Sequence, residues 1–226
     1  MEDQSTAATT RLTDSLADQE LLEQLLDQTK PPMPPECEGY DFLLATPFRY
    51  APYPDGSRFR RAMQPEGAFY GAEQVETAVA ELAFYRLLFF YEAPAAKRPN
   101  MAAEHSAFSV RVSARALDLT AAPFLADRET WTHPTEYGPC QDLADAARDA
   151  GIEAVRYESV RDPNHGVSLA VLTVTALASK APDKRQTWHI YIRDRGVQAW
   201  CEFPRRRLEF PMDAFSADPR MAAISR

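Results

Sequence analysis

The sequence has few of the residues that would indicate a metal centre, a disulfide framework or a membrane anchor. Its three cysteines, Cys37, Cys140 and Cys201, lie far apart, and none is part of a CxxC or Cys/His pattern. This spacing suggests neither a zinc site nor a disulfide framework, and it favours a reducing compartment. The amino-terminal residues contain no apolar signal segment, and no later run reaches the length of a membrane span. We therefore expect a cytoplasmic protein that needs no metal and does not contact a membrane.

Basic residues are also in short supply. The chain has 25 lysines and arginines against 33 aspartates and glutamates, which gives a formal net charge of −8. Broad binding to a nucleic-acid backbone needs a basic face, so we do not expect direct nucleic-acid binding. An anionic ligand would have to be met by a local cluster of arginines. With 226 residues, 45% of them hydrophobic, the chain can bury the core of one large domain without covalent staples.

The sequence pattern divides the chain into three parts. Residues 1–39 form an amino-terminal extension, in which leucines at helical spacing over residues 12–29 predict one amphipathic helix that ends before Pro31 and Pro32. This helix packs either on its own domain or on a partner, for example a second copy of the chain in a homodimer. Residues 40–210 form the predicted catalytic domain, and residues 211–226 form a carboxy-terminal tail in which we recognise no chemistry.

The stretch from Arg58 to Glu81 combines charge and aromatic residues in a way that a fold alone does not need. Arg58, Arg60 and Arg61 follow a Pro/Asp/Gly turn, and they cannot all face the same way on an extended chain. At least one of these arginines can therefore reach a phosphate or a carboxylate, which a guanidinium binds in bidentate fashion. The simpler alternative is a solvated basic loop.

An aromatic pair follows, in which Phe69 and Tyr70 lie between Gly67 and Gly71. Glycine allows a backbone to approach a ligand closely, and Tyr70 would offer a stacking face and a hydroxyl group. The alternative is a short strand in the core.

A helix is predicted from Gln74 to about Tyr91, and Glu81 lies in its apolar part. The residues three and four positions from Glu81 include no cation. A buried carboxylate is costly unless it is paired or hydrogen-bonded. Glu81 therefore points into a solvated cleft or has a partner from elsewhere in the fold, and either arrangement makes it a site candidate.

Several further segments predict strands and a short helix. Apolar runs and alternation predict strands over 40–50, 106–119, 152–160 and 167–178, a helix over 141–150, and a hairpin of 187–192 with 197–203. Arg49 ends the first of these strands. Ser159 and Arg161 follow the strand 152–160, where side chains can contact a ligand, although a serine there also commonly caps its own turn. We read 204–207 as a solvated basic edge.

Five segments, in order, resemble the RES-domain family, which is named for its arginine, glutamate and serine positions. The segments are GSRF (56–59), GAFYGA (67–72), TAVAE (77–81), ALDLT (116–120) and RYESVRDP (156–163). The resemblance covers roughly residues 42–205. It implies an α+β protein, a single compact mixed α/β domain similar in fold to the ADP-ribosyltransferase toxins, preceded here by a helical extension.

The resemblance also implies an activity and a partner. Members of this family are typically the toxins of bacterial toxin–antitoxin pairs and consume NAD, so NAD is the expected substrate, with inorganic phosphate as a candidate co-substrate and no metal. We expect cleavage of the nicotinamide–ribose bond by phosphorolysis or hydrolysis. The alternatives are mono-ADP-ribosylation of a protein target and, in a different class, a domain without catalysis that binds a partner. The expected partner is an antitoxin of the helix-turn-helix type.

The family positions can be carried over to this sequence. The resemblance assigns catalytic roles to Glu81, Arg58 and Tyr70, and NAD-binding roles to Arg49, Tyr50 and Ser159, with Arg60 as the alternative to Arg58. Arg161 is a further NAD-binding candidate because of its place at the exit of the strand 152–160. Two departures matter: many members have Trp-Asn after the arginine where this chain has Phe59-Arg60, and the loop before Gly67 is longer. Either Arg58 or Arg60 can therefore fill the family's arginine position.

Overall fold

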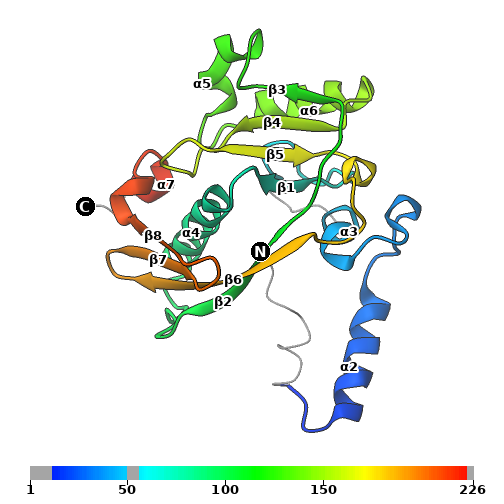
Figure 1. The fold of residues 1–226 in the computed structure, drawn as a ribbon, viewed down its shortest axis with the longest axis vertical. Helices are drawn as coiled ribbons and strands as arrows, with labels where there is room; N and C mark the ends of the chain where they lie inside the picture. Colours follow the sequence, from blue (N-terminus) through cyan, green and yellow to red (C-terminus); the bar gives the residue numbers. More distant parts are fainter. Residues whose placement is uncertain (1–11, 50–55, 223–226) are drawn as a thin grey trace.

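The computed structural model describes residues 12–49 and 56–222, and its helices and strands form two four-stranded sheets with one long helix between them (Figure 1). The helices are α2 (Leu16–Thr29), α3 (Phe42–Arg49), α4 (Val75–Glu92), α5 (Arg128–Trp131), α6 (Gly138–Asp149) and α7 (Pro219–Ala222). The strands are β1 (Phe69–Ala72), β2 (Ala103–Ser109), β3 (Ala116–Asp118), β4 (Ala154–Glu158), β5 (Val167–Val171), β6 (Lys184–Arg193), β7 (Gly196–Cys201) and β8 (Arg206–Pro211). This architecture confirms the predicted mixed α/β class with a helical amino-terminal segment.

The first sheet has the strand order β1-β5-β4-β3, with β3 parallel to β4 and the other pairs antiparallel. Successive residues of a strand face opposite sides of the sheet, so Ala170 and Val171 of β5 enter two different clusters. Ala170 packs with Val155, Tyr157 and the buried face of α6. Val171 packs with Leu44 of α3 and with other residues of the opposite cluster. Both faces of this sheet are therefore covered.

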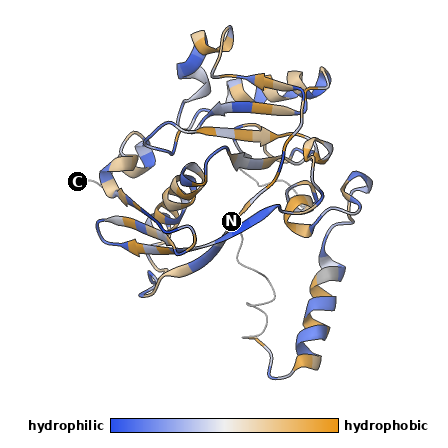
Figure 2. Cartoon of the chain, in the orientation of Figure 1, coloured by the Kyte–Doolittle hydropathy of each residue, from blue (hydrophilic) through white to orange (hydrophobic). Residues whose placement is uncertain are grey.

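The second sheet has the order β2-β6-β7-β8 and is antiparallel throughout. Helix α4 packs on it and also contacts β1 and β5 of the first sheet. The helix is apolar around most of its circumference (Figure 2), as expected for a helix enclosed by other elements. Because α4 carries Glu81, this central position places the candidate carboxylate between the two sheets.

One predicted strand is a helix. We expected residues 40–50 to form a strand, but Phe42–Arg49 forms α3, with Tyr50 outside the described residues. An apolar run of this length fits either a strand or a buried helix, and local capping decides between them. Here Asp41 caps the helix, because its carboxylate accepts the amide hydrogen of Leu43 at 2.9 Å and its carbonyl accepts that of Ala45 at 3.0 Å.

Two other predicted strands are shorter than expected. The run 106–119 is divided between β2 in the second sheet and β3 in the first, since the chain crosses from one sheet to the other between them. The run 167–178 ends as a strand at Val171 and continues into the 3₁₀ turn Val174–Ala176. Alternation continued through both breaks in the sequence, so the pattern alone did not reveal them.

The predicted helix over 74–91 and the hairpin of 187–192 with 197–203 are confirmed. The basic segment 204–207 leads into the edge strand β8, which pairs with β7, and Pro204, Arg205 and Arg207 are exposed, as expected for a solvated edge. The tail beyond β8 contributes to the core, because Phe215 and Met221 are buried among residues of α4 and the second sheet.

Helix α2 begins at Leu16 and extends away from the two sheets (Figure 1). Leu16, Leu21 and Leu25 are exposed over 79%, 55% and 50% of their surface, so the leucine stripe is not packed on the domain. Among the described helices, none combines the length and the apolar character needed to cross a membrane.

Candidate active site

Glu81 lies near the middle of α4, and its partner comes from the other half of the site. Its Oε1 accepts a hydrogen bond of 2.5 Å from the hydroxyl group of Ser159, at the end of β4. Burial raises the pKa of the Glu81 carboxyl; the Ser159 hydrogen bond and the charges of Arg161 and Arg58 offset only part of that effect. Of the two alternatives left by the sequence, a partner from elsewhere in the fold is present: the Ser159 hydroxyl group, with the charges of Arg161 and Arg58 also acting on the carboxyl.

Ser159 is completely buried, and all the hydrogen-bonding capacity of its side chain is in use. Its Oγ accepts the backbone amides of Arg161 at 3.3 Å and Asp162 at 3.1 Å. A hydroxyl group has two lone pairs and one proton, so its proton is left for Glu81. The alternative that Ser159 caps its own turn is confirmed, and its hydroxyl group also donates to Glu81. A contact between Ser159 and a ligand stays a prediction.

The turn after β4 is tied to the first part of α4. Thr77, one helical turn before Glu81, donates through Oγ1 to the carboxylate of Asp162 at 2.7 Å, and both residues are buried. Gly166 closes the turn against these two side chains, so closely that a Cβ atom at this position would collide with both. The turn and the helix therefore form one unit, in which a change at either side alters the position of the Glu81 carboxylate.

Arg58 is buried, with 8% of its surface exposed, and its charge lowers the pKa of the Glu81 carboxyl. It donates to the carbonyl groups of Trp131 at 2.7 Å and His133 at 2.9 Å, and its guanidinium carbon lies 4.8 Å from the centre of the Tyr137 ring. A guanidinium group has five N–H donors, so Arg58 can hold this loop and still offer positive charge and a donor to an anion.

Tyr70 presents its ring outwards while its hydroxyl group is bound. The residue is 39% exposed, and its hydroxyl lies 2.8 Å from Ser57 Oγ and accepts the amide of Phe59 at 3.1 Å. Burial of the hydroxyl raises the pKa of Tyr70. Phe69 points into the core and Tyr70 to the opposite side, so the predicted core strand and the predicted exposed aromatic face are both present in β1.

The remaining candidates are placed differently. Arg60 is also buried, but its guanidinium donates to the carbonyls of Gln64 and Pro65 in its own loop, and burial lowers its pKa. Arg49 donates through Nε to Pro31 at 2.7 Å, which joins α3 to the preceding connector. Tyr50 lies outside the described residues. Arg161 is 4% exposed and forms an ion pair with Asp218.

Three tyrosines near Glu81 were not predicted as site residues. Tyr85 lies one turn after Glu81 on α4 and is 50% exposed; its partial burial, together with the nearby Tyr137 and Glu81, raises its pKa to about 12. Tyr137 accepts a hydrogen bond of 3.3 Å from Arg161 and faces Arg58. Burial, and then the charge of Glu81, raises the pKa of Tyr157 well above its usual range. Helical spacing from Glu81 was a usable signal for Tyr85; Tyr137 and Tyr157 come from distant segments.

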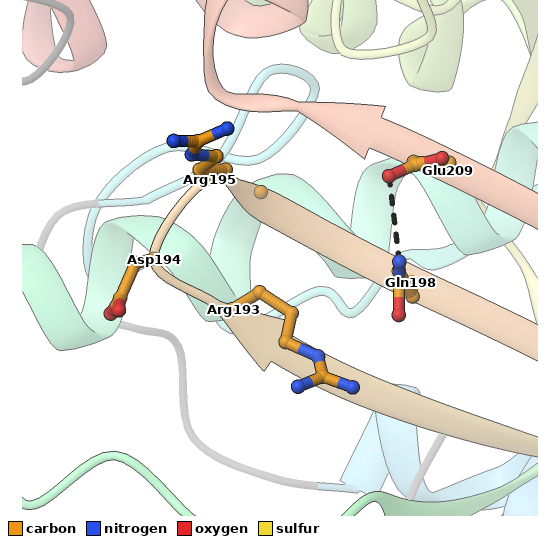
Figure 3. A pocket seen from close by; sticks show the side chains of 6 residues that line it. Arg193, Asp194, Arg195, Gln198 and Glu209 are labelled. Atoms are coloured by element: carbon orange, nitrogen blue, oxygen red, sulfur yellow. Dashed lines mark hydrogen bonds between the residues drawn. The ribbon is translucent and has the colours of Figure 1, made fainter.

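A pocket elsewhere on the molecule does not coincide with these residues. It has a volume of about 360 Å³ and is formed around the β6–β7 turn by Arg193, Asp194, Arg195, Gly196, Gln198 and Glu209 (Figure 3). Its side chains come from the β6–β7 hairpin and, for Glu209, from the edge strand β8, and they carry both signs of charge. The candidate active site is instead defined by the buried contacts around Glu81.

The chain belongs to the RES-domain family, since the RES domain matches residues 34–193. RES domains are generally linked to NAD-utilising toxins of toxin–antitoxin systems. The match confirms the family that the five sequence segments suggested. A comparison with curated protein sequences gives no match.

Proposed function

We propose that this protein cleaves the bond between nicotinamide and ribose in NAD, with Glu81 as the catalytic carboxylate. The observation that carries the proposal is the environment of Glu81. The partly buried Glu81 carboxylate accepts a hydrogen bond from Ser159, whose side chain has all its hydrogen bonds in use, and the charges of Arg58 and Arg161 act on the carboxyl. Active sites commonly contain such carboxyl groups with a perturbed pKa and a specific partner.

The chemistry uses the charge that develops as the bond breaks. When the bond from ribose C1′ to the nicotinamide nitrogen lengthens, its electron pair leaves with nicotinamide, and the sugar acquires oxocarbenium character. The ionised Glu81 carboxylate stabilises that positive charge. Water or inorganic phosphate then bonds to C1′. If water attacks, Glu81 can accept its proton, and the product is ADP-ribose; if phosphate attacks, the product is ADP-ribose 1-phosphate.

The other residues bind and orient NAD in this proposal. Arg58 takes the family's arginine position and attracts the pyrophosphate; its charge acts on the Glu81 carboxyl, whereas Arg60 donates to carbonyl groups of its own loop. Tyr70 offers its exposed ring as a stacking surface for nicotinamide or ribose. Ser159 and Arg161 act through Glu81 and through the turn. Arg49 contributes from the end of α3 if the pyrophosphate extends in that direction.

Product analysis tests the reaction. The purified chain is incubated with NAD, with and without phosphate, and the products are identified by mass spectrometry and phosphorus NMR. We expect free nicotinamide together with ADP-ribose, or with ADP-ribose 1-phosphate when phosphate is present. Label that remains on a protein would support ADP-ribosyl transfer instead. Unchanged NAD under all conditions would overturn the proposal and favour the partner-binding alternative.

We also propose that the protein acts on cytoplasmic NAD as a toxin and that a helix-turn-helix antitoxin neutralises it. The exposed leucines of α2 support a protein partner, either the antitoxin or a second copy of the chain. Expression of the wild type should stop growth and lower cellular NAD, whereas Glu81→Gln should do neither. Co-expression of a small helix-turn-helix protein encoded beside the gene should restore growth. If growth is arrested equally by both forms of the protein, toxicity does not come from NAD cleavage.

A further inference from the structure

The carboxy-terminal tail beyond β8 lies outside the matched RES domain, which ends at residue 193, yet the tail reaches the candidate site. After β8, the chain forms the 3₁₀ turn Met212–Phe215 and the short helix α7. Figure 1 shows this segment returning beside α4 and the loop that joins β4 to β5. Phe215 packs edge-on against Phe84 of α4 with ring centroids 5.7 Å apart. The tail therefore contacts the helix that carries Glu81, three residues after that carboxylate.

Asp218 is the charged residue that connects the tail to the site. It is 2% exposed, forms an ion pair with Nη1 of Arg161, and accepts two hydrogen bonds of 3.0 and 2.9 Å from the guanidinium group of Arg220. Burial alone would raise the pKa of Asp218, but the hydrogen bonds from Arg220 and the charge of Arg161 bring it below its ordinary value. Asp218 is thus an ionised, buried carboxylate between two arginines.

Arg161 transmits this contact towards Glu81. Its guanidinium carbon lies 4.2 Å from the centre of the Phe84 ring, and its Nη2 donates to Pro134 at 2.5 Å and to Tyr137 at 3.3 Å. Its backbone amide donates to Ser159 Oγ. A fixed Arg161 side chain therefore fixes the turn whose serine holds Glu81. A charge as deeply buried as Arg161 is costly without its partner, so Asp218 determines whether this arrangement is stable.

We propose that Asp218 is a positioning residue for Glu81, and that the tail from Met212 to Ala222 completes the active site through the series Asp218, Arg161, Ser159 and Glu81. This inference rests on the proposed function in treating Glu81 as the catalytic carboxylate. It assigns a role in catalysis to a segment that the family match does not cover.

A single and a double variant distinguish a positioning role of Asp218 from a role in folding alone. Asp218→Asn keeps the shape of the side chain but removes its charge, so both Tm and kcat should fall, kcat by roughly tenfold to 100-fold because a small displacement of a catalytic group is costly. The double variant Arg161→Met/Asp218→Asn removes both charges; its Tm should recover towards the wild-type value, because no unpaired buried charge remains. Its kcat should stay low, with KM changing less than kcat.

The control is Asp183→Asn, which removes a partner of Arg111 from an exposed ion pair. This variant should keep the wild-type Tm, kcat and KM. If kcat recovers together with Tm in the double variant, or if Asp218→Asn has wild-type kcat, the proposal is wrong. A double variant that does not fold would also overturn it, because the tail would then be a folding element.

A second measurement does not depend on the reaction. In Asp218→Asn, hydrogen exchange at the amides of Arg161 and Asp162, which donate to Ser159, should become faster, whereas in Asp183→Asn it should match the wild type. Unchanged exchange would contradict the link between the tail and the turn even if NAD is cleaved. If the wild type cleaves no NAD, the proposed function fails, while faster exchange still supports the link.

Discussion

The two sheets of this protein use burial for different purposes. In the second sheet, Trp188, Ile190 and Val197 are buried with α4, and within the described residues His105 is the one buried polar or charged residue that its strands contribute. Around the first sheet, the buried set includes Arg58, Arg60, Thr77, Ser159, Arg161, Asp162 and Ser168. The second sheet therefore stabilises the fold, while the first sheet carries polar groups that need partners to offset the cost of burial.

Helix α4 packs against both sheets, and this explains how the buried polar groups around the first sheet are tolerated. Its residues Val79, Ala83 and Leu87 lie in the apolar cluster of the second sheet, while Thr77 and Glu81 contact the turn after β4. A rigid helix with a firm apolar contact can hold a carboxylate that would otherwise move to solvent. Changes on the two sides should therefore separate activity from stability.

The largest expected effect is on activity, from Glu81→Gln. The amide keeps the size of the side chain and still accepts the Ser159 hydrogen bond, but it cannot balance positive charge on the sugar. We expect kcat to fall by about 100-fold to 1,000-fold, measured by nicotinamide release. The control is Glu76→Gln on the same helix, whose carboxylate pairs with Arg206 at the surface and which should retain full activity. Equal losses in the two variants would remove the distinction between the regions.

A smaller loss is expected from Ser159→Ala, which leaves the amides of Arg161 and Asp162 and the Glu81 carboxylate without their shared hydroxyl. We expect kcat to fall about tenfold to 100-fold and stability to fall by about 1–3 kcal/mol. The Ser159 hydrogen bond lowers the pKa of Glu81, so its removal should raise that pKa further and move the acid limb of the pH–rate profile to higher pH. Ser168→Ala, another buried serine in the same sheet, is the control, and its acid limb should not move.

The sequence was informative about the site because its chemistry is local. The arginines, the glycine-bounded tyrosine and Glu81 fall within one stretch, and the absence of a cation near Glu81 on its helix left two alternatives, a solvated cleft or a partner from elsewhere; the Ser159 hydrogen bond supplies the partner. The family match confirms the resemblance on which the roles were assigned. The roles themselves remain predictions, and the charge of Arg58 is among those that lower the pKa of Glu81.

What the sequence did not reveal depends on contacts between distant segments. The strand predicted over 40–50 is wrong: most of this run forms α3, which Asp41 caps. The run 106–119 is divided between two sheets. The sequence indicated no chemistry in the tail, because Asp218 is buried only when the tail packs against Arg161 and Phe84. Local patterns cannot report a charge that is buried only after the tail has folded back.

The second sheet should respond to core substitutions in stability alone. Ile190→Val removes one buried methylene from a residue that is 1% exposed, so we expect the free energy of unfolding to fall by about 0.5–1.5 kcal/mol. Both kcat and KM should remain at wild-type values, because Ile190 contacts α4 on its apolar side. Urea denaturation and nicotinamide release provide the two measurements. A change in kcat that exceeds twofold would mean that the two sides of α4 are coupled more strongly than the contacts indicate.

The smallest expected effect is on the stability of Glu81→Gln as a function of pH. Burial raises the pKa of Glu81 in the folded protein above its unfolded value, so protonated Glu81 favours the fold. That contribution is fully present below the unfolded pKa and is lost as pH rises through the folded pKa. Glutamine does not titrate, so the variant should be as stable as the wild type or more stable at neutral pH, and this advantage should disappear in acid.

Urea denaturation across this pH range, with Glu76→Gln as the control, measures the difference. If Glu81→Gln is less stable than the wild type at neutral pH, the ionised carboxylate stabilises the fold. The region around the first sheet would then not bear the free-energy cost of burying charge that we assign to it.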